Sequence, residues 1–289
     1  MNPRIALFFD LFKLRIGLVI GVTALAGVAV VPGAGPALWP TVLLIFAVVV
    51  SSAAAGAFNQ YVERHIDARM ARTRARPFVT GRLQASPQWL VLIVVMSLGS
   101  IVVATLATNV LAALYTFLGA FVYGVVYTVW LKRRTWLNIV IGGLAGSFAV
   151  LAGAAAVAPD RLDGAPLWLA VVLFLWTPPH FWSLAIAYRK DYEATGVPML
   201  PVVVGDARAA QAILASAALL VCASLVPAWY GLGWLYLVAA IGGGAFFLTK
   251  SVALAVEPCR RTAMANFHAS LVQLSLLLAG AIADATLLH

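Results

Sequence analysis

The sequence predicts an all-α polytopic membrane protein with nine transmembrane helices, and three observations support this fold. Of its 289 residues, 63% are hydrophobic and 10% are charged, whereas a soluble domain carries about 25% charged residues. Apolar runs near the length that crosses a bilayer, about 20 residues, recur along the chain. These runs do not alternate with polar residues as the strands of a membrane barrel do, which excludes an all-β fold.

Charge clusters and Pro/Gly turns divide the chain into nine apolar segments. The predicted spans lie near 14–33, 38–58, 88–107, 110–130, 137–157, 166–187, 210–229, 232–250 and 264–286. The first span follows a basic flank, as a secretory signal peptide does, but eight further spans make cleavage unnecessary for membrane insertion. Only about a dozen residues precede this span, which leaves little room for an organelle transit peptide. We therefore expect a bacterial cell (inner) membrane protein.

The distribution of Lys and Arg predicts the orientation. If the N-terminus is cytoplasmic and the chain crosses nine times, 18 of the 19 Lys and Arg residues are cytoplasmic and only Arg161 lies outside. A missed or extra span would disturb this agreement with the positive-inside rule. The C-terminus is then expected outside. The net charge of +9 indicates the membrane surface and anionic ligands rather than nucleic acid, because the basic residues sit between apolar runs.

We expect a single transmembrane domain, 1–289, whose function lies in two cytoplasmic loops, about 59–87 and 188–209. Five of the ten carboxylates fall in these loops, and the external connections are short. Cys222 is expected inside a span and Cys259 in a cytoplasmic loop, so the two cysteines do not indicate a disulfide or a metal site.

The first loop begins with the segment NQYVERHIDARMARTRARPFVTG. Asn59, Glu63 and Asp67 recur every four residues and line one stripe if the preceding helix continues through them. Oxygen ligands at this spacing suit Mg²⁺, which binds through one or two carboxylates plus substrate phosphates. The arginines that follow, including Arg72 and Arg76, suit phosphate. The alternative interpretation is a solvated loop whose arginines only obey the positive-inside rule.

The second loop follows the segment TPPHFWSLAIAYRKDYEATGVPMLPVV. Pro178 and Pro179 are expected to break or kink the sixth span. If the helix resumes, His180 and Asp191 fall near one face, with Asp191 at the mouth and His180 deeper. His180 then bonds freed carbonyls, contacts a substrate or ligates a substrate iron, and Asp191 offers a second metal site. The segment GVPMLPVVVG is expected to form a structured loop or lid.

A third basic patch, from Lys132 to Arg134, lies in the segment WLKRRTWLNIVIGG on the same side of the membrane. Two interpretations stay open for it. The patch either binds anions or anchors the fourth and fifth spans in lipid headgroups.

Together these motifs resemble the UbiA-type intramembrane prenyltransferases, whose first motif is NxxxDxxxD and whose second acidic motif follows the sixth helix. Asn59, Glu63 and Asp67 match the first motif. Within that superfamily the chain is similar to the protoheme IX farnesyltransferase (heme O synthase) family. The similar segments are NQYVERHIDARMARTRARP, YTVWLKRRTWLNIVIGGLAGS, TPPHFWSLAIAYRKDYEATGVPMLPVV and FHASLVQLSLLLAGAIADATL. They extend from the second span to the end of the chain, and the third is the most specific.

The chain departs from the family pattern at three places. Glu63 stands where the family favours Asp, and His65 where it often has Asp. Segment 147–157 lacks the Pro-Pro and Gly-Trp pattern that is common in the fifth span. Because Glu also binds Mg²⁺, Glu63 is compatible with the metal site. The difference at 147–157 bears on the identity of the acceptor.

The resemblance implies a prenyltransferase that moves a farnesyl group from farnesyl diphosphate to a vinyl group of heme B and gives heme O. It implies Mg²⁺ held by Asn59, Glu63 and Asp67 and, on the other side, by Asp191. The residues expected to bind the diphosphate are Arg72, Arg76, Lys132, Arg133 and Lys190, and the candidates for acceptor contacts are His180, Tyr188 and Tyr192. The implied partners are the two substrates, the lipid bilayer and a heme A synthase or oxidase-assembly protein, with no nucleic acid.

Three other functions are alternatives to farnesyl transfer to heme B. A UbiA-type enzyme that prenylates an aromatic or quinone-precursor acceptor would keep every diphosphate residue. A secondary transporter is disfavoured because the carboxylates lie at one face and no half-length repeat is found. A non-catalytic assembly factor would not need the Asn/Glu/Asp stripe opposite Asp191.

Overall fold

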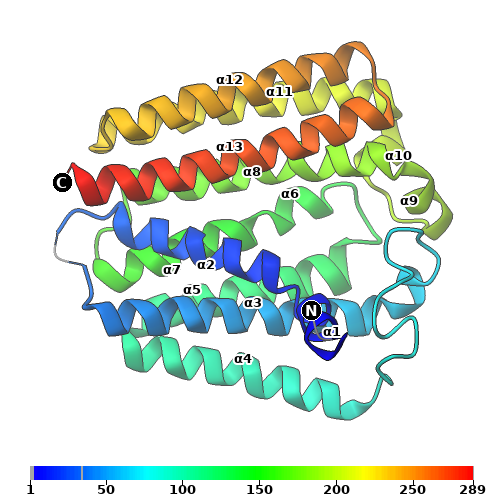
Figure 1. The fold of residues 1–289 in the computed structure, drawn as a ribbon, viewed down its shortest axis with the longest axis horizontal. Coiled ribbons are helices and arrows are strands. Elements are labelled where there is room, and N and C mark those ends of the chain that lie inside the picture. The colour runs from blue at the N-terminus through cyan, green and yellow to red at the C-terminus, as the bar shows by residue number, and fades with distance from the viewer. Residues whose placement is uncertain (1–2, 34, 289) are drawn as a thin grey trace.

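The computed structural model describes residues 3–33 and 35–288, and these form helices and turns without strands. The long helices run side by side along the longest axis of the molecule (Figure 1). They are α2 (Leu14–Ala29), α3 (Leu38–Asp67), α4 (Pro87–Ala107), α5 (Val110–Phe121), α7 (Leu144–Val157), α8 (Ala165–Ala187), α11 (Asp206–Leu225), α12 (Trp234–Val256) and α13 (Arg260–Leu287). The shorter elements are α1 (Pro3–Leu11), the π-helix η1 (Val122–Leu131), α6 (Asn138–Gly142), α9 (Arg189–Thr195), α10 (Leu200–Val204) and the 3₁₀-helix η2 (Val226–Tyr230).

Eight helical segments within the described ranges are long and apolar enough to cross a membrane, so the protein is a multi-pass membrane protein. Three of them are composite, formed by α5 with η1, by α6 with α7, and by α11 with η2. The first predicted span corresponds to α2, whose 16 residues rise about 24 Å at about 1.5 Å per residue. This is shorter than a hydrocarbon core of about 30 Å.

Helix α8 lies at the centre of the bundle, and α4 lies at its edge. In α8, 72% of the apolar window is buried, against 17% in α4. Helix α8 packs against α7, α11 and α13. Helix α4 instead exposes Val91, Val94 and Val95, which is the expected arrangement for a lipid-facing helix because lipid chains accept apolar side chains.

Helices α2 and α7 approach each other through glycines. A Cβ on Gly153 would overlap the carbonyl oxygen of Ala24, and a Cβ on Gly27 would overlap that of Val150. Small residues let two membrane helices come this close, where van der Waals contacts replace the hydrophobic effect that is absent in lipid. Residues 147–157, which depart from the family pattern, thus supply part of the contact with the first long helix.

Of the predicted break or kink at Pro178 and Pro179, the break is wrong, because α8 continues through both residues to Ala187. Both prolines are buried, and packing on α7, α11 and α13 holds the helix around them. The hydroxyl of Ser183 donates to the carbonyl oxygen of Pro179 at 2.6 Å. Neighbouring helices and hydroxyl side chains are what make proline tolerable inside a membrane helix.

Helix α5 changes into the π-helix η1 before it ends at Leu131. The hydroxyl of Thr128 donates to the carbonyl oxygen of Tyr123 at 2.8 Å. The rings of Tyr123 and Tyr127 stack, with centroids 5.8 Å apart. A π-helical stretch is rare and is frequently found at functional sites. This one leads directly to Lys132.

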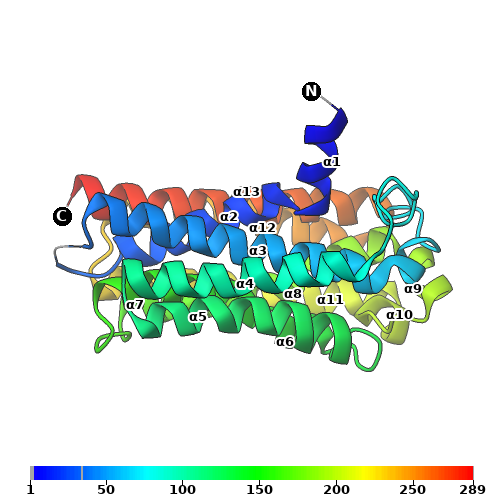
Figure 2. The same ribbon diagram turned by 90° about the horizontal axis from the view of Figure 1, so that it is seen from below.

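The two ends of the bundle differ. One end, here called the loop end, carries the 68–86 and 132–137 loops, α9, α10 and the turn between α12 and α13 (Figure 1). The opposite end carries the 158–164 loop and the C-terminal end of α13. Helix α1 does not follow the bundle direction but projects crosswise from it (Figure 2).

Candidate active site

The last turns of α3 bring the predicted stripe to the loop end of the bundle. Helix α3 runs without interruption to Asp67, so the helix predicted through Asn59, Glu63 and Asp67 is present. Their exposed fractions are 2%, 1% and 2%. Carboxylates are almost never buried to this degree unless they are paired. The solvated-loop interpretation is therefore wrong for these three side chains.

Each member of the stripe is paired with a different cation. Lys13 Nζ donates to Asn59 Oδ1 at 2.6 Å. Lys132 Nζ lies 2.5 Å from Glu63 Oε2. An Arg76 guanidinium nitrogen lies 2.5 Å from an Asp67 carboxylate oxygen. Three cations from three separate segments thus converge on one face of α3, at the place where a polyanion would be held.

The amide of Asn59 is fixed by hydrogen bonds on both sides. Its nitrogen donates to Glu63 Oε2 at 2.9 Å and to the hydroxyl of Thr128 at 3.1 Å. Its oxygen accepts from Lys13, which also donates to the hydroxyl of Tyr123 at 2.9 Å. The π-helix therefore forms one wall of the site, and Asn59 joins that wall to α3.

Lys13 was not among the predicted site residues, although the structure places it against the stripe. In the sequence it is one of several basic residues that flank the first span, and the positive-inside rule accounts for them all. Its fixed position depends on a left-handed backbone, φ 48° and ψ 42°. Burial of the ammonium group, and then the charge of Arg76, hold the pKa of Lys13 well below its usual range.

The stripe fits a Mg²⁺ ion by the chemistry of its oxygens. Glu63 Oε1 is buried and has no hydrogen-bond partner among the described residues, and such an oxygen is costly unless something binds it. One amide and two carboxylate side chains are oxygen donors of the kind that Mg²⁺ takes together with substrate phosphates. No group of three His, Cys, Asp or Glu residues in the described part of the chain is arranged as a metal site. Substrate phosphates and water would supply further ligands.

Asp191 lies where the two loops meet rather than on the stripe. The helix that carries His180 ends at Ala187, and Asp191 belongs to the separate short helix α9. The prediction that Asp191 and His180 share one helix face is therefore wrong, because Tyr188 interrupts the helix with φ −120° and ψ 29°. Asp191 Oδ2 accepts instead from the backbone N–H of Arg72 at 3.2 Å.

Further contacts join the two predicted loops. A guanidinium nitrogen of Arg69 donates to the carbonyl oxygen of Ala194. Two guanidinium groups lie over the ring of Tyr188, that of Arg72 at 5.9 Å and that of Arg260 at 5.6 Å from the ring centroid. Arg260, at the start of α13, is a second residue of this region, after Lys13, that the sequence did not predict. The loops therefore close on each other across the mouth of the site.

The other predicted residues have varied surroundings. Arg133 and Lys190 are exposed, and Tyr192 is buried. Lys190 lines a surface pocket with Tyr188, Asp191 and Arg260. The GVPMLPVVVG segment is partly helical, since it contains α10. Within the described chain, the stripe meets only some of the predicted cations, namely Arg76 and Lys132.

His180 is held in one orientation deeper in the bundle. Its ring stacks between those of Trp176 and Phe267, with centroids 4.1 Å and 4.4 Å away. Its Nδ1 lies 2.7 Å from Ser270 Oγ, which itself donates to the carbonyl oxygen of Phe267. When the Ser270 hydroxyl donates to Phe267 in this way, Nδ1 of His180 is the donor and Nε2 carries the lone pair. The expected bond to a carbonyl freed by proline is replaced by this one.

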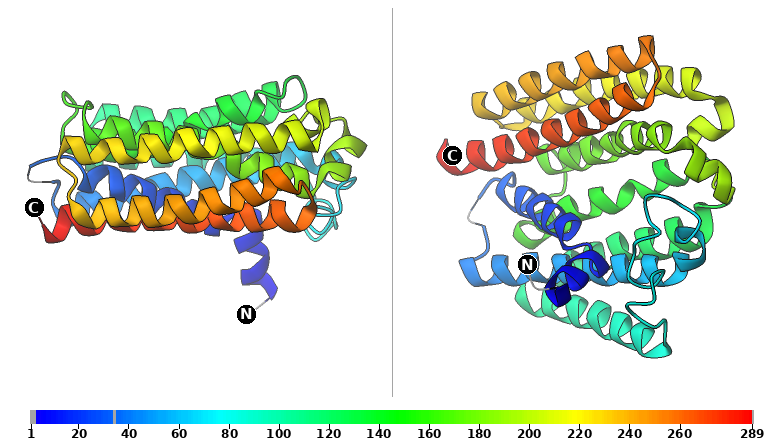
Figure 3. Two further views of the ribbon diagram at one scale, coloured as in Figure 1. Left: turned by 90° about the horizontal axis from the view of Figure 1, so that it is seen from above. Right: turned by 45° about the vertical axis from the view of Figure 1, so that its right-hand side comes forward.

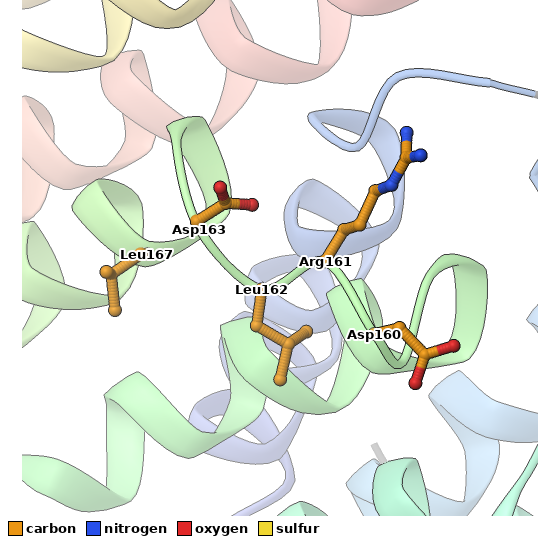
Figure 4. A pocket seen from close by; sticks show the side chains of 5 residues that line it. All are labelled: Asp160, Arg161, Leu162, Asp163 and Leu167. Carbon is orange, nitrogen blue, oxygen red and sulfur yellow. The ribbon is translucent and has the colours of Figure 1, made fainter.

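A second hollow lies at the opposite end of the bundle (Figure 4). It is lined by Asp160, Arg161, Leu162, Asp163 and Leu167, from the loop between α7 and α8. The buried polar stripe and its three cations are at the loop end, so this hollow does not belong to the candidate site.

Comparison with known proteins agrees with this geometry. Residues 20–277 match the UbiA prenyltransferase family. The chain belongs to this family. Among relatives within the UbiA prenyltransferase family, protoheme IX farnesyltransferase 2 of Paramagnetospirillum magneticum is 54% identical over 284 residues, which cover 98% of each chain.

Several solved structures share the fold. One, described as digeranylgeranylglyceryl phosphate synthase, has a TM-score of 0.78 at 17% identity and covers 97% of this chain and 98% of its own. Another is a UbiA homologue from Archaeoglobus fulgidus bound to DMAPP and Mg²⁺, with a TM-score of 0.69 at 13% identity, covering 93% and 98% of the two chains. At these identities the likeness establishes the all-α fold of the family.

Proposed function

We propose that this prenyltransferase transfers the farnesyl group of farnesyl diphosphate to a vinyl group of protoheme IX (heme B), giving heme O and diphosphate. The observation that carries the proposal is the buried stripe of Asn59, Glu63 and Asp67 with one cation on each member. The 54% identical relative named protoheme IX farnesyltransferase 2 supports the choice of substrates.

The cations around the stripe have a direct role in breaking the C–O bond. When the diphosphate enters, Lys13, Lys132 and Arg76 exchange an amide or carboxylate oxygen for phosphate oxygens. Arg72, and at the surface Arg133 and Lys190, add positive charge at the mouth. Charges already aimed at the leaving group stabilise the transition state without reorganisation, which is often the largest part of catalysis.

Asn59, Glu63 and Asp67 would hold Mg²⁺ through their oxygens, and Asp191 would face the ion from the second loop. What the ion supplies when bound is neutralisation of the charge that develops on the diphosphate. The Archaeoglobus fulgidus homologue bound to DMAPP and Mg²⁺ supports this assignment. Glu63 Oε1, which is buried without a hydrogen-bond partner among the described residues, is the first Mg²⁺ ligand that we assign.

The acceptor reacts in the apolar interior of the bundle. Loss of diphosphate leaves an allylic farnesyl cation, and the electron pair of the heme vinyl group attacks it to form the new C–C bond. Water then adds to the resulting cation and loses a proton, which completes a hydroxyethylfarnesyl group. His180, Tyr188 and Tyr192 contact the acceptor or place this water. The closed loops keep other water away from the allylic cation.

We place the whole chain, 1–289, in one transmembrane domain of a bacterial inner membrane. In this arrangement α2 is a ninth crossing, the N-terminus and the two active-site loops face the cytoplasm, and the C-terminus lies outside. The 18 Lys and Arg residues assigned to the cytoplasmic side support this orientation. A heme A synthase or an oxidase-assembly protein is the partner that would take up heme O.

The test is expression in a bacterial host that lacks its own heme O synthase, followed by chromatography and mass measurement of membrane hemes. We expect heme O with the wild-type protein and none with Asp67→Asn. Comparable amounts of folded protein must be present in both cultures. If folded wild-type protein yields only heme B, the heme acceptor is wrong, and aromatic acceptors with a panel of prenyl diphosphates become the next substrates to assay.

A further inference from the structure

We infer that α1 lies flat in the membrane interface with its phenylalanines among the lipid chains, and that this anchorage holds Lys13 in the diphosphate site. The phenylalanine face of α1 is thus an interaction surface, and its partner is the lipid bilayer. Only the identity of the anion that Lys13 meets rests on the proposed function.

The direction of α1 is the first observation. The spans run along the membrane normal, and α1 projects crosswise from them when the bundle is viewed from below or above (Figures 2 and 3). A helix crosswise to the spans runs in the membrane plane. Its depth is given by Gln60, which donates to the carbonyl oxygens of Asp10 and Leu11 at 2.6 Å and 3.2 Å. Gln60 lies two residues beyond Phe58, where the apolar part of α3 ends, so α1 lies where the hydrocarbon core ends.

The apolar stripe of α1 is the second observation. Ile5, Phe8 and Phe9 are 49%, 49% and 39% exposed, and with Phe12 they follow the spacing of one helix face. At 100° per residue, exposed Asp10 lies on the opposite side of the helix. An amphipathic helix in the plane of a bilayer buries such an aromatic face at the boundary of headgroups and acyl chains.

The corner after α1 is the third observation. Leu11 is fully buried in a cluster with Ala54, Ala57, Phe78 and Ile93. The chain then turns through Lys13, whose positive φ is the only one outside glycine in the described residues. Such a backbone is unfavourable for a residue with a Cβ and persists only where its surroundings enforce it.

The stem of Lys13 passes over Gly56, where a Cβ would lie 3.4 Å from Lys13 Cδ. Its ammonium group ends on Asn59 and Tyr123. The corner therefore has α1 on one side and α2 on the other. Lipid contacts that fix the direction of α1 also fix the strained turn, and through it the position of Lys13.

The first experiment measures the depth of α1 with a nitroxide label in phosphatidylcholine/phosphatidylglycerol nanodiscs. The background is the full chain with Cys222→Ala and Cys259→Ser, labelled at Phe8→Cys or, as the matched control, at Asp10→Cys. We expect the label at position 8 to collide with oxygen rather than with a water-soluble nickel chelate, and the label at position 10 to show the reverse. Equal access of the chelate to both positions would place α1 in water and overturn the inference.

The second experiment measures the coupling to the site. Phe8→Ser/Phe9→Ser is compared with Trp229→Ser, a control at the opposite end where the side chain is 80% exposed. We expect a several-fold higher KM for farnesyl diphosphate only in the double variant, with heme B binding unchanged in both. An unchanged KM with α1 shown at lipid depth would overturn the coupling. Failure of wild-type protein to make heme O would instead refute the proposed function, and the label experiment would still decide the position of α1.

Discussion

Lys132 Nζ lies 2.5 Å from Glu63 Oε2, and the two side chains are 11% and 1% exposed. The pair joins the end of the π-helix to the middle of the oxygen stripe, 69 positions away in the chain. Two charges this deeply buried are each costly to remove from water, and each depends on the other for compensation. The pair therefore links the integrity of the site to the position of the π-helix.

Replacement of one partner should cost both stability and activity. In Lys132→Met the Glu63 carboxylate loses its cation, and breaking a buried pair costs about 3–5 kcal/mol. We expect a clearly lower Tm in detergent and no measurable heme O. In Lys132→Met/Glu63→Gln both the ammonium group and the carboxylate charge are removed, so Tm should recover while activity does not. A double variant no more stable than Lys132→Met would contradict the assignment of a compensating pair.

Lys13 should matter for substrate binding more than for folding. A hydrogen bond to a charged group contributes about 1.5–3 kcal/mol, so Lys13→Met should raise the KM for farnesyl diphosphate by about 10- to 100-fold. Heme B binding should not change, because the ammonium group of Lys13 ends on Asn59 and Tyr123 at the proposed diphosphate site. Arg15→Met is the matched control, since Arg15 lies two residues away in the first turn of α2 and is exposed. Equal KM values for the two variants would exclude Lys13 from the diphosphate site.

The Mg²⁺ concentration needed for activity should depend on the charge and the length of the side chain at position 63. Glu63→Gln keeps the shape of the side chain but removes its charge, and we expect loss of activity at every Mg²⁺ concentration. Glu63→Asp keeps the charge on a shorter stem, so activity should remain and half-saturation should move to higher free Mg²⁺. The measurement is the initial rate of heme O formation after chelation and stepwise return of Mg²⁺. An Asp variant with wild-type Mg²⁺ dependence would argue against a ligand at this position.

The sequence was sufficient for those features that local periodicity determines. Hydropathy over windows of about 20 residues locates membrane helices, and eight of the nine predicted spans correspond to helical segments, within the described residues, that are long and apolar enough to cross a membrane. A repeat of four places Asn59, Glu63 and Asp67 on one helix stripe, as observed. Both inferences require only the types of residues that are close together in the sequence.

The sequence did not predict the features that depend on packing between distant segments. Lys13 meets Asn59 across 46 positions, and nothing local distinguishes it from Arg15 as a headgroup anchor. Pro178 and Pro179 are helix breakers by local chemistry, yet α8 continues through them because three helices pack around it. Asp191 was assigned to a continuing helix, whereas α8 ends at Ala187.

The close approach of α2 and α7 gives a prediction about stability that is independent of the chemistry. A Cβ at position 153 would meet backbone atoms of Ala24 and Val28, which cannot move aside as a flexible side chain could. Overpacking costs about 1–3 kcal/mol, so Gly153→Ala should lower Tm and the yield of folded protein.

The matched control is Gly242→Ala in α12, where a Cβ would meet nothing within 4 Å. Alanine is favoured over glycine inside a helix by about 1 kcal/mol, so this variant should be as stable as wild type or more stable. Thermal unfolding of both variants in the same detergent is the measurement. If Gly153→Ala is as stable as Gly242→Ala, backbone contact between α2 and α7 does not limit stability, and the small residues of 147–157 would need another explanation, such as the shape of the acceptor cavity.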